Sequence, residues 1–319
     1  GSTGRGLLDG SFVVSANNSL VGTSAGAGTV RLETDSTNNS IVAQFQDNTT
    51  NRIRVAPLND PTFALASGDT YTIHSGFITN TLDGGTAVIL QASNDITINS
   101  AIIANNSGGA GGDLTLQAGR SVLINANITT DDGNLIIIAN DLLANGVIDA
   151  QRDSGAAAIT MGAATTLNTG SGNLTITLRD GAGKTNSTSG LITIETLTST
   201  GTVAISGTNG VLFNQSLSGL GTMTVEGDSN NSSDGTDSIT IAAGLSIAST
   251  GSITLDATTG GITLAGGATF SATSGMTVND TLSISTGTAI FSSATSINDL
   301  ALSGGALQAD GDVSVTNGF

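Results

Sequence analysis

The sequence predicts an all-β protein built as a β-solenoid, in which short strands wind through stacked coils. Three observations lead to this prediction. The 319 residues include 44 glycines, the aromatic share is only 3%, and strands of the form apolar-x-apolar recur along most of the chain. This composition favours pleated strands and tight turns over long helices and fits a narrow aliphatic core. The recurrent Ile, Leu and Val triplets argue against disorder, the competing interpretation of a chain rich in glycine and serine.

Residues 1–78 are predicted to form a separate N-terminal β-rich module. This segment holds both prolines, the only His and Tyr, and four of the seven arginines. Charged and apolar residues alternate in it, which is typical of an antiparallel meander with one solvated face. We interpret the module as a cap, an outgrowth or an irregular first set of coils. Strands are expected at Ser11–Ser15, Thr29–Glu33, Ile41–Gln46, Arg52–Val55 and Thr70–His74.

Residues 79–319 are predicted to form the solenoid. Triplets such as Ile96–Ile98 and Leu174–Ile176 place Thr or Ser between two apolar residues, so one face is buried and the other wet. The segments that follow Gly85, Gly112 and Gly133 can be superimposed, and these glycines are 27 and 21 residues apart. At roughly 20 to 25 residues per coil, the region accommodates about ten coils.

A run of β-sandwich modules is the competing architecture, because it also has short alternating strands with frequent turns. Turns rich in Gly, Asn and Asp, few aromatic residues and the absence of long strands favour the solenoid. Each coil leaves an unpaired edge that its neighbour covers. The pattern continues to Val313–Val315, close to the last residue. We therefore expect an open edge there, which is covered by further coils or by end-to-end stacking of a second chain.

Charge and composition exclude several classes of partner and chemistry. The formal net charge is −17, so a nucleic-acid backbone would be repelled. The absence of cysteine removes disulfides, thiolate catalysis and Cys-based metal sites. No apolar run approaches the length that crosses a bilayer, the most apolar stretch being 135–139; we expect no membrane insertion. The chain begins without Met or a signal-peptide core, which indicates a mature chain or a fragment.

Candidate catalytic groups are few, and we predict no catalytic residues. His74 is the only histidine and could serve as a base for a serine, but no nucleophile-elbow sequence accompanies it. Carboxylate pairs of the kind that hydrolyse glycosides occur at Asp131–Asp132 and at Asp310 with Asp312. Turn solvation accounts for these carboxylates without chemistry. The solenoid has few cations to accompany them, namely Arg120, Arg152, Arg179 and Lys184.

A Ca²⁺ site is the one cofactor hypothesis that the residues suggest. The segment Gly108–Asp113 is similar to the glycine-aspartate nonapeptide of Ca²⁺-binding β-rolls, but Thr115 stands where that motif has a large apolar residue. The alternative acidic loop contains Asp228, Asp234 and Asp237, without the ligand spacing of an EF-hand. Asp113 and these three aspartates are therefore the candidate metal ligands, and no other cofactor is expected.

Several Asn-x-Ser/Thr sequons could accept a sugar in an exported chain. The composition alone generates such sequons, and several of them lie within predicted strands. The competing structural role is a buried ladder in which each Asn stacks on an Asn of the next coil. The sequons considered are those at Asn48, Asn127, Asn173, Asn186 and Asn279.

The repeats carry a family resemblance. The phrase Gly112–Ala118, followed by Val122–Ala126 and Asp132–Leu135, resembles the repeats of filamentous haemagglutinin-like adhesins, which are two-partner secretion exoproteins. Val88–Ile98 has the same alternation of apolar and polar residues, and the likeness extends to Phe319, over about three quarters of the chain. The Asn-Pro motif of that family's secretion domain is not matched here.

The resemblance implies a right-handed parallel β-helix, export across an outer membrane, and a role in adhesion, aggregation or biofilm formation. Implied partners are glycans or proteins of host or neighbouring cells, and the implied location is extracellular, at the bacterial surface or in a secreted fibre. We therefore expect a non-catalytic adhesive shaft. Two alternatives are a polysaccharide-active β-helix enzyme, indicated by Asp grouped with Arg or Lys on one face, and a carbohydrate- or Ca²⁺-binding module, indicated by Ca²⁺-dependent folding.

Overall fold

The computed structural model describes residues 73–317 except 233–236, 259, 265–267, 285–287 and 292–293, together with three short strands nearer the N-terminus. These strands are β1 (Val30–Arg31), β2 (Val42–Phe45) and β3 (Arg54–Ala56), and they pair antiparallel in the order β1-β2-β3. The antiparallel pairing predicted from the alternating residues is thus present. The strand expected at Ser11–Ser15 lies outside the described residues, as does most of that expected at Thr70–His74.

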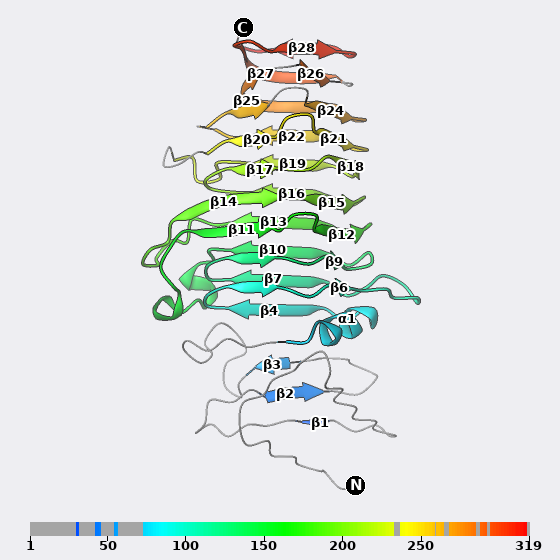
Figure 1. Ribbon diagram of the computed structural model, residues 1–319, viewed down its shortest axis with the longest axis vertical. Helices are drawn as coiled ribbons and strands as arrows, with labels where there is room; N and C mark the ends of the chain where they lie inside the picture. Colours follow the sequence, from blue (N-terminus) through cyan, green and yellow to red (C-terminus); the bar gives the residue numbers. More distant parts are fainter. Residues whose placement is uncertain are drawn as a thin grey trace.

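The remaining strands form three parallel columns, here called columns 1, 2 and 3, that run along the long axis (Figure 1). Each coil contributes one strand to each column, and β25 and β27 span columns 1 and 2. Nine coils are complete, and β29 begins a tenth. Column 1 contains β4 (Val88–Ala92), β7 (Leu114–Ala118), β10 (Leu135–Ala139), β13 (Leu174–Leu178), β16 (Val203–Ser206), β19 (Met223–Glu226), β22 (Ile253–Asp256), β25 (Met276–Ile284), β27 (Thr295–Leu302) and β29 (Val313–Val315).

Columns 1 and 2 together make one 17-stranded parallel sheet, because β25 and β27 join them, whereas column 3 is two sheets of four and five strands. Column 2 contains β5 (Ile96–Ile98), β8 (Val122–Ile124), β11 (Ala157–Met161), β14 (Ser189–Ile194), β17 (Val211–Phe213), β20 (Ile239–Ile241) and β23 (Ile262–Leu264). Column 3 contains β6 (Ile102–Ile103), β9 (Ile128–Thr129), β12 (Thr166–Gly170), β15 (Thr196–Ser199), β18 (Leu217–Leu220), β21 (Ser246–Ser249), β24 (Thr269–Ala272), β26 (Thr288–Phe291) and β28 (Ala306–Ala309).

This all-parallel stack is consistent with the predicted β-solenoid and differs from a β-sandwich, whose sheets are antiparallel. The repeat length varies widely along column 1. It is 18 residues from Thr295 to Val313 and 39 residues from Leu135 to Leu174, while the paired strands remain in register. The variation lies in the turns between strands, which explains why the sequence period is hard to follow beyond the first coils.

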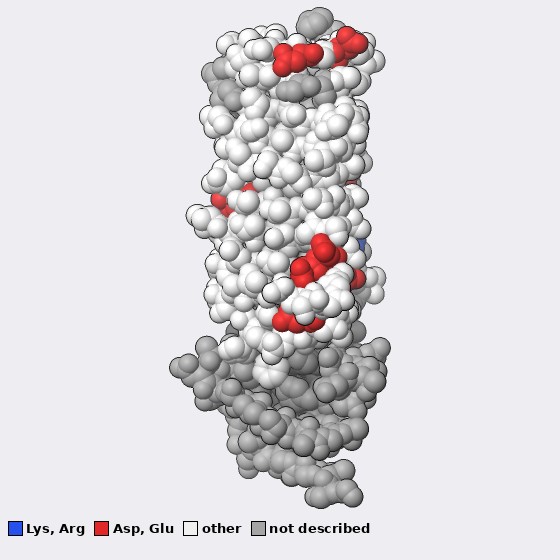
Figure 2. All heavy atoms as spheres, turned by 90° about the vertical axis from the view of Figure 1, so that its right-hand side faces the viewer, with Lys and Arg blue, Asp and Glu red and all other residues white. Residues whose placement is uncertain are grey.

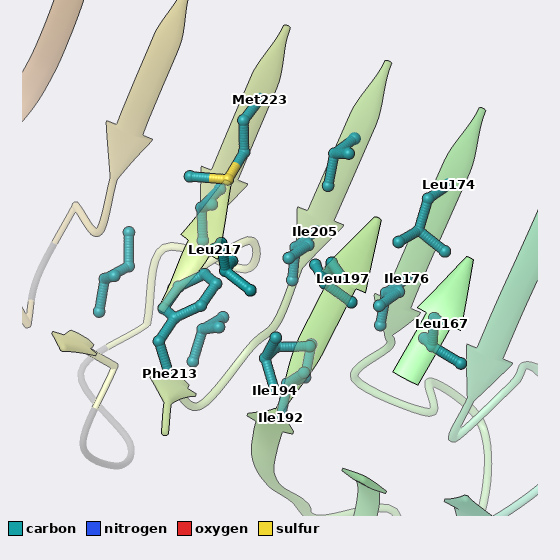
Figure 3. Packing of buried hydrophobic residues seen from close by; sticks show 14 of the residues in the cluster. Leu167, Leu174, Ile176, Ile192, Ile194, Leu197, Ile205, Phe213, Leu217 and Met223 are labelled. Carbon is teal, nitrogen blue, oxygen red and sulfur yellow. The ribbon is translucent and has the colours of Figure 1, made fainter. Parts of the chain in front are cut away.

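The core is the narrow space enclosed by the three columns, and apolar side chains fill it. Alternate residues of each strand point inward, so that Leu174, Ile176 and Leu178 of β13 are fully buried and the threonines between them are not. Figure 3 shows side chains from several coils meeting in this space. Three phenylalanines are buried among the residues whose side chains are described, namely Phe213, Phe270 and Phe291, and the last two stack in successive coils with ring centroids 5.6 Å apart.

Helix α1 (Ser75–Asp83) closes the N-terminal end of this core and was not predicted from the sequence. Ile78 and Leu82 are buried against the first coil. Hydrogen bonds tie the helix to that coil, from Ile103 N to Thr79 Oγ1 (3.3 Å) and from Asn105 N to Asp83 Oδ1 (2.6 Å). A strand cannot end a stack of strands without leaving an open edge, whereas a helix can cover the apolar end. No helix in the described part of the chain is long and apolar enough to span a membrane.

The turn from column 3 to the next column 1 is here called the glycine corner. A Cβ atom on Gly133 would lie 2.3 Å from Gly112 O, one on Gly172 2.3 Å from Gly133 O, and one on Gly201 2.5 Å from Gly172 O. Successive coils therefore touch backbone to backbone, at a separation that only glycine permits. Buried hydroxyls reinforce the turn, since Thr169 Oγ1 donates to Gly172 O at 2.7 Å.

Candidate functional site: the charged corner

The turn from column 1 to column 2 is here called the charged corner. It contains three long excursions, at 140–156, 179–188 and 227–238, the last of which includes the undescribed residues 233–236. The other coils have short turns, except that β25 and β27 continue through the corner without a break. The first excursion includes two 3-10 helices, η1 (Leu143–Asn145) and η2 (Asp149–Gln151). All Lys and Arg residues described between residues 73 and 317 lie at this corner, in coils two to four: Arg120, Arg152, Arg179 and Lys184. The corner is therefore the main concentration of charge pairs in the stack.

Asp141 is the centre of this corner, and its side chain is completely buried. Its Oδ1 accepts from Leu142 N (2.9 Å) and Asn145 Nδ2 (2.8 Å), and it lies 3.0 Å from Arg179 Nε. Its Oδ2 accepts from Gln117 Nε2 of the preceding coil. One carboxylate thus connects coils two, three and four, and the number of donors around it offsets the cost of burying the charge.

Gln117 extends this connection toward the N-terminus. Its Oε1 accepts from Gln91 Nε2 at 2.8 Å, one coil earlier and in register on column 1. Side chains of four consecutive coils, Gln91, Gln117, Asp141 and Arg179, are therefore linked in a line parallel to the long axis. The line runs in the same direction as the backbone hydrogen bonds between coils.

Arg152 and Lys184 bind mostly backbone carbonyls. Arg152 Nε donates to Gly119 O (3.0 Å) and its Nη1 to Asn186 O (2.5 Å), so it joins the coil-two turn to the coil-four excursion. Lys184 Nζ donates to Gly119 O (2.7 Å) and to Asp141 O. Both cations are nearly buried, with exposed fractions of 8%. They donate to backbone carbonyl groups that converge in the turns between columns 1 and 2.

The environment of Lys184 perturbs its ionisation. Burial, and to a smaller extent the positive charge of Arg152, lower the pKa of Lys184 to about 8. The same burial lowers the pKa of Arg152, with a further contribution from Arg120. A lysine with a pKa near neutrality can act as a base in an active site, so the group is a chemical candidate as well as a structural one.

Arg120 forms the outer part of the corner. It is bidentate on Asp95 of the preceding coil, with Nε to Oδ1 at 2.8 Å and Nη2 to Oδ2 at 2.5 Å, and it lies 3.6 Å from Asp153. The hydrogen bonds to Asp95 raise the pKa of Arg120. Asp95 Oδ1 also accepts from Ser121 N at 2.9 Å. These ion pairs are partly exposed and again join one coil to the next.

The candidate catalytic residues from the sequence do not meet at this corner. His74 Nδ1 accepts from Gly76 N at 3.0 Å and caps helix α1. Asp131 and Asp132 adopt left-handed backbone conformations in a turn and accept backbone N–H groups of Asn106 and Ser171. The hydrogen bond from Ser171 lowers the pKa of Asp132. Asp310 and Asp312 are exposed, at the far end of the stack.

The candidate Ca²⁺ ligands are divided between the two corners. Asp113 belongs to the glycine corner, where its Oδ1 accepts from Asn134 N at 2.7 Å. Asp228 and Asp237 both lie in the excursion 227–238 and are almost completely buried, and Asp234 lies outside the described residues. Among the described residues no group of three or more His, Cys, Asp and Glu side chains could hold a metal ion.

The sequon asparagines that the structure describes are exposed. Asn173 Oδ1 accepts from Thr202 N and Asn127 Oδ1 from Thr166 N, both at 2.9 Å and both one coil onward. Asn134 Oδ1 accepts in the same way from Asn173 N (2.9 Å). A ladder between coils therefore exists, but it is exposed rather than buried and often uses backbone N–H groups. Asn48 lies outside the described residues.

The four cations could be recognised in the sequence, but the cluster that they form with Asn140 and Asp141 could not. A signal was present, since Arg120 and Arg179 each follow a column 1 strand by one or two residues. In Figure 2, most acidic residues gather near the two ends of the described stack, and the face between them carries few charges. Comparison of the chain with family models, curated proteins and solved structures finds no match.

Proposed function

We propose that this chain is a stiff, non-catalytic shaft of an extracellular bacterial surface protein, which presents its long faces for adhesion or aggregation. The observation that carries the proposal is the in-register pairing of column 1 from Val88 to Val315. The inter-coil hydrogen bonds run along the long axis, so a load on the ends is shared among them.

The charged corner supports the same proposal. The ionisable groups of Asp141, Arg152 and Lys184 are used in bonds between coils, where they join the excursions to the stack. From β13 onward the outward residues of column 1 are mostly Thr and Ser, as in Thr175, Thr224 and Thr254. Such a surface suits repeated weak contacts with glycans or with other shafts.

We further propose that the coils wind as a right-handed parallel β-helix. Parallel strands joined by a crossover are right-handed in nearly all proteins. The similarity of Gly112–Ala118 to filamentous haemagglutinin-like repeats agrees with this hand, and it supports export through two-partner secretion as the route to the cell surface. Self-association end to end through solenoid edges is part of the proposal.

Electron microscopy of the purified chain tests the shaft. Negative staining with and without Ca²⁺ should show rods, either separate or joined end to end into filaments. Beads coated with the chain should then aggregate with each other or adhere to cells, whereas beads coated with an unrelated acidic protein should not. Compact round particles would contradict the shaft, and rods without any adhesion would leave a purely structural role and remove the adhesive one.

A polysaccharide-active enzyme is the second candidate, because Asp, Arg and Lys side chains do gather on one corner and the pKa of Lys184 is lowered to about 8. Their burial and their bonds to the backbone favour the structural role. Incubation of the chain with a panel of acidic and neutral polysaccharides tests the alternative. Release of new chain ends by the wild type, and not by Lys184→Met, would favour the enzyme.

A further inference from the structure

We infer that coils one to four form one cooperative unit, here called the interlocked block, which opens as a whole, whereas the later coils open in smaller steps. The inference rests on hydrogen bonds that skip a coil. In a solenoid each repeat normally contacts only the repeats beside it, so its opening is coupled to those neighbours alone. A bond that reaches the second neighbour couples three coils at once. The inference does not depend on an adhesive role.

Hydrogen bonds that skip a coil join coil one to coil three. The excursion at 140–156 follows β10 of coil three and reaches the turn of coil one. There Ile148 N donates to Ser93 Oγ at 3.2 Å. Asn94 and Asp153 bond reciprocally, with Asn94 Nδ2 to Asp153 Oδ2 at 2.6 Å and Asp153 N to Asn94 Oδ1 at 3.2 Å. Coil one is therefore held by coil three as well as by coil two.

A second connection joins coil two to coil four. Lys184, in the excursion of coil four, donates from Nζ to Gly119 O of coil two at 2.7 Å, and it also donates to Asp141 O of coil three. A Cβ atom on Gly119 would lie 2.7 Å from Val147 Cγ1, so the coil-three excursion packs against the same glycine. Lys184 and Val147 are both buried. Because the connection between coils one and three overlaps with that between coils two and four, the four coils are interlocked.

The later coils are joined in a simpler way. From coil five onward, the side-chain bonds between coils that the structure describes join direct neighbours, as from Ser206 Oγ to Glu226 Oε2 (2.9 Å) and from Asn279 Nδ2 to Asp256 Oδ2 (3.0 Å). No Lys or Arg follows Lys184 in the sequence, so these coils have no cation of their own to bridge carboxylates. Glu226 and Asp256 face each other in register, and like charges in that position oppose stacking.

This difference determines how the stack opens. A coil of the interlocked block cannot separate without breaking bonds to its second neighbour, so the opening of one coil favours the opening of the others. A later coil breaks bonds to its direct neighbours alone. In the shaft proposed above, a load along the axis would therefore extend the later coils in steps while the interlocked block stays folded.

Native-state hydrogen exchange of the full chain tests the interlocked block, in urea below the concentration that unfolds the whole chain. Urea is uncharged, so it leaves the ion pairs unscreened. The slope of an amide's opening free energy against urea concentration measures the surface exposed in that opening. Amides of β4, β7, β10 and β13 should share one slope, and the slopes of β19, β22 and β27 should be about half as large or smaller.

Two variants cut the two connections separately. Ser93→Ala combined with Asn94→Ala removes the bonds between coils one and three, and the slope of β4 should then fall below that of β10. Lys184→Met removes the direct bond between coils two and four, and the slope of β13 should fall below that of β7. Ser206→Ala is the matched control, because it removes a bond between neighbours only, and it should leave the slopes of β16 and β19 unchanged.

The wild type alone can overturn the inference. It is wrong if the slopes differ from strand to strand between β4 and β13, or if one common slope extends from β4 to β27. It is also wrong if both connection variants retain the wild-type slopes, or if Ser206→Ala changes the slopes of its coils as much as they do. If one connection variant does not fold, the slopes of the other decide in the same way.

Discussion

The two corners of the stack hold the coils together by different means. At the glycine corner, Gly133 and Gly172 bring successive backbones so close that no side chain can enter. At the charged corner, the coils separate into excursions, and Asp141, Arg152 and Lys184 fill the space between them. The first solution repeats through consecutive coils, from Gly133 to Gly221, whereas the second is built once, around coils two to four.

This difference shows where a solenoid tolerates change. A corner that relies on direct backbone contact has a fixed geometry, and an insertion there would displace the coils above it. A corner bridged by side chains can absorb inserted residues, provided that the polar groups of the insertion find partners. The excursion at 140–156 meets this condition through Asn140, whose side-chain nitrogen donates to Arg179 O (3.0 Å) and Ser189 Oγ (2.9 Å).

The largest effect is expected at the centre of the charged corner. Asp141→Ala removes the buried carboxylate that accepts from Gln117 and Asn145 and pairs with Arg179, and we expect the free energy of unfolding to fall by about 3–5 kcal/mol. Denaturant titration measures the change. Asp310→Ala, at an exposed position, is the control and should fall within about 0.5 kcal/mol of the wild type. Equal changes in the free energy of unfolding for the two substitutions would show that Asp141 is not central to the charged corner.

The glycine corner should respond to a single methyl group. Gly172→Ala places a Cβ 2.3 Å from Gly133 O, and because backbone cannot move aside cheaply, we expect a loss of about 2–3 kcal/mol. Gly162→Ala is the matched control, since its nearest neighbours would lie at 3.4 Å, an ordinary contact distance. Thermal unfolding of both variants tests the comparison, and it fails if Gly162→Ala is the more damaging change.

Of the two corners, only the charged corner should make the free energy of unfolding change with pH in the alkaline range. Since burial lowers the pKa of Lys184 to about 8, the unfolded chain binds more protons than the folded one between pH 8 and 10.5. The free energy of unfolding should therefore increase by roughly 2 kcal/mol from pH 8 to pH 10. Lys184→Met should abolish the increase in denaturant titrations at the two pH values. A wild type that loses stability over this range would contradict the assignment.

The exposed ladder should contribute least. Asn173→Ala removes the acceptor of Thr202 N, and we expect a loss of about 0.5–1.5 kcal/mol. Asn173→Asp retains an acceptor, as Asp113 does at the equivalent position two coils earlier, and should stay close to the wild type. Hydrogen exchange of the Thr202 amide distinguishes the two, and similar protection in both variants would show that the ladder is unimportant.

The repeating parts of the fold were predictable from the sequence, because they follow from local patterns. Triplets such as Leu174–Ile176 identify inward and outward faces, and the glycine markers Gly112 and Gly133 do lie on one corner. Gly85 does not belong to it, since the atom that faces Gly112 in the preceding coil is Thr86 O. In the first coil, the glycine spacing therefore locates the turn but picks a residue one position before the one that faces Gly112.

The charged corner and helix α1 were not predictable in the same way. Arg120, Asp141 and Lys184 are far apart in the sequence, and only the stacking of coils whose lengths differ brings them together. Helix α1 has weak sequence signals, since His74 is an uncommon cap and the helix is short. Its position depends on the apolar end of the core, which exists only after the coils have stacked.

The stacking itself is the central claim, and distances between spin labels test it most directly. The chain has no native cysteine, so nitroxides can be attached through Thr115→Cys, Thr277→Cys and Ser314→Cys on the outward face of column 1. Six coil steps separate the first pair and eight separate Thr115 from Ser314. At about 4.8 Å per step, distances of about 29 Å and about 38 Å are expected. Distances that do not increase in proportion to the number of coils would contradict the stack.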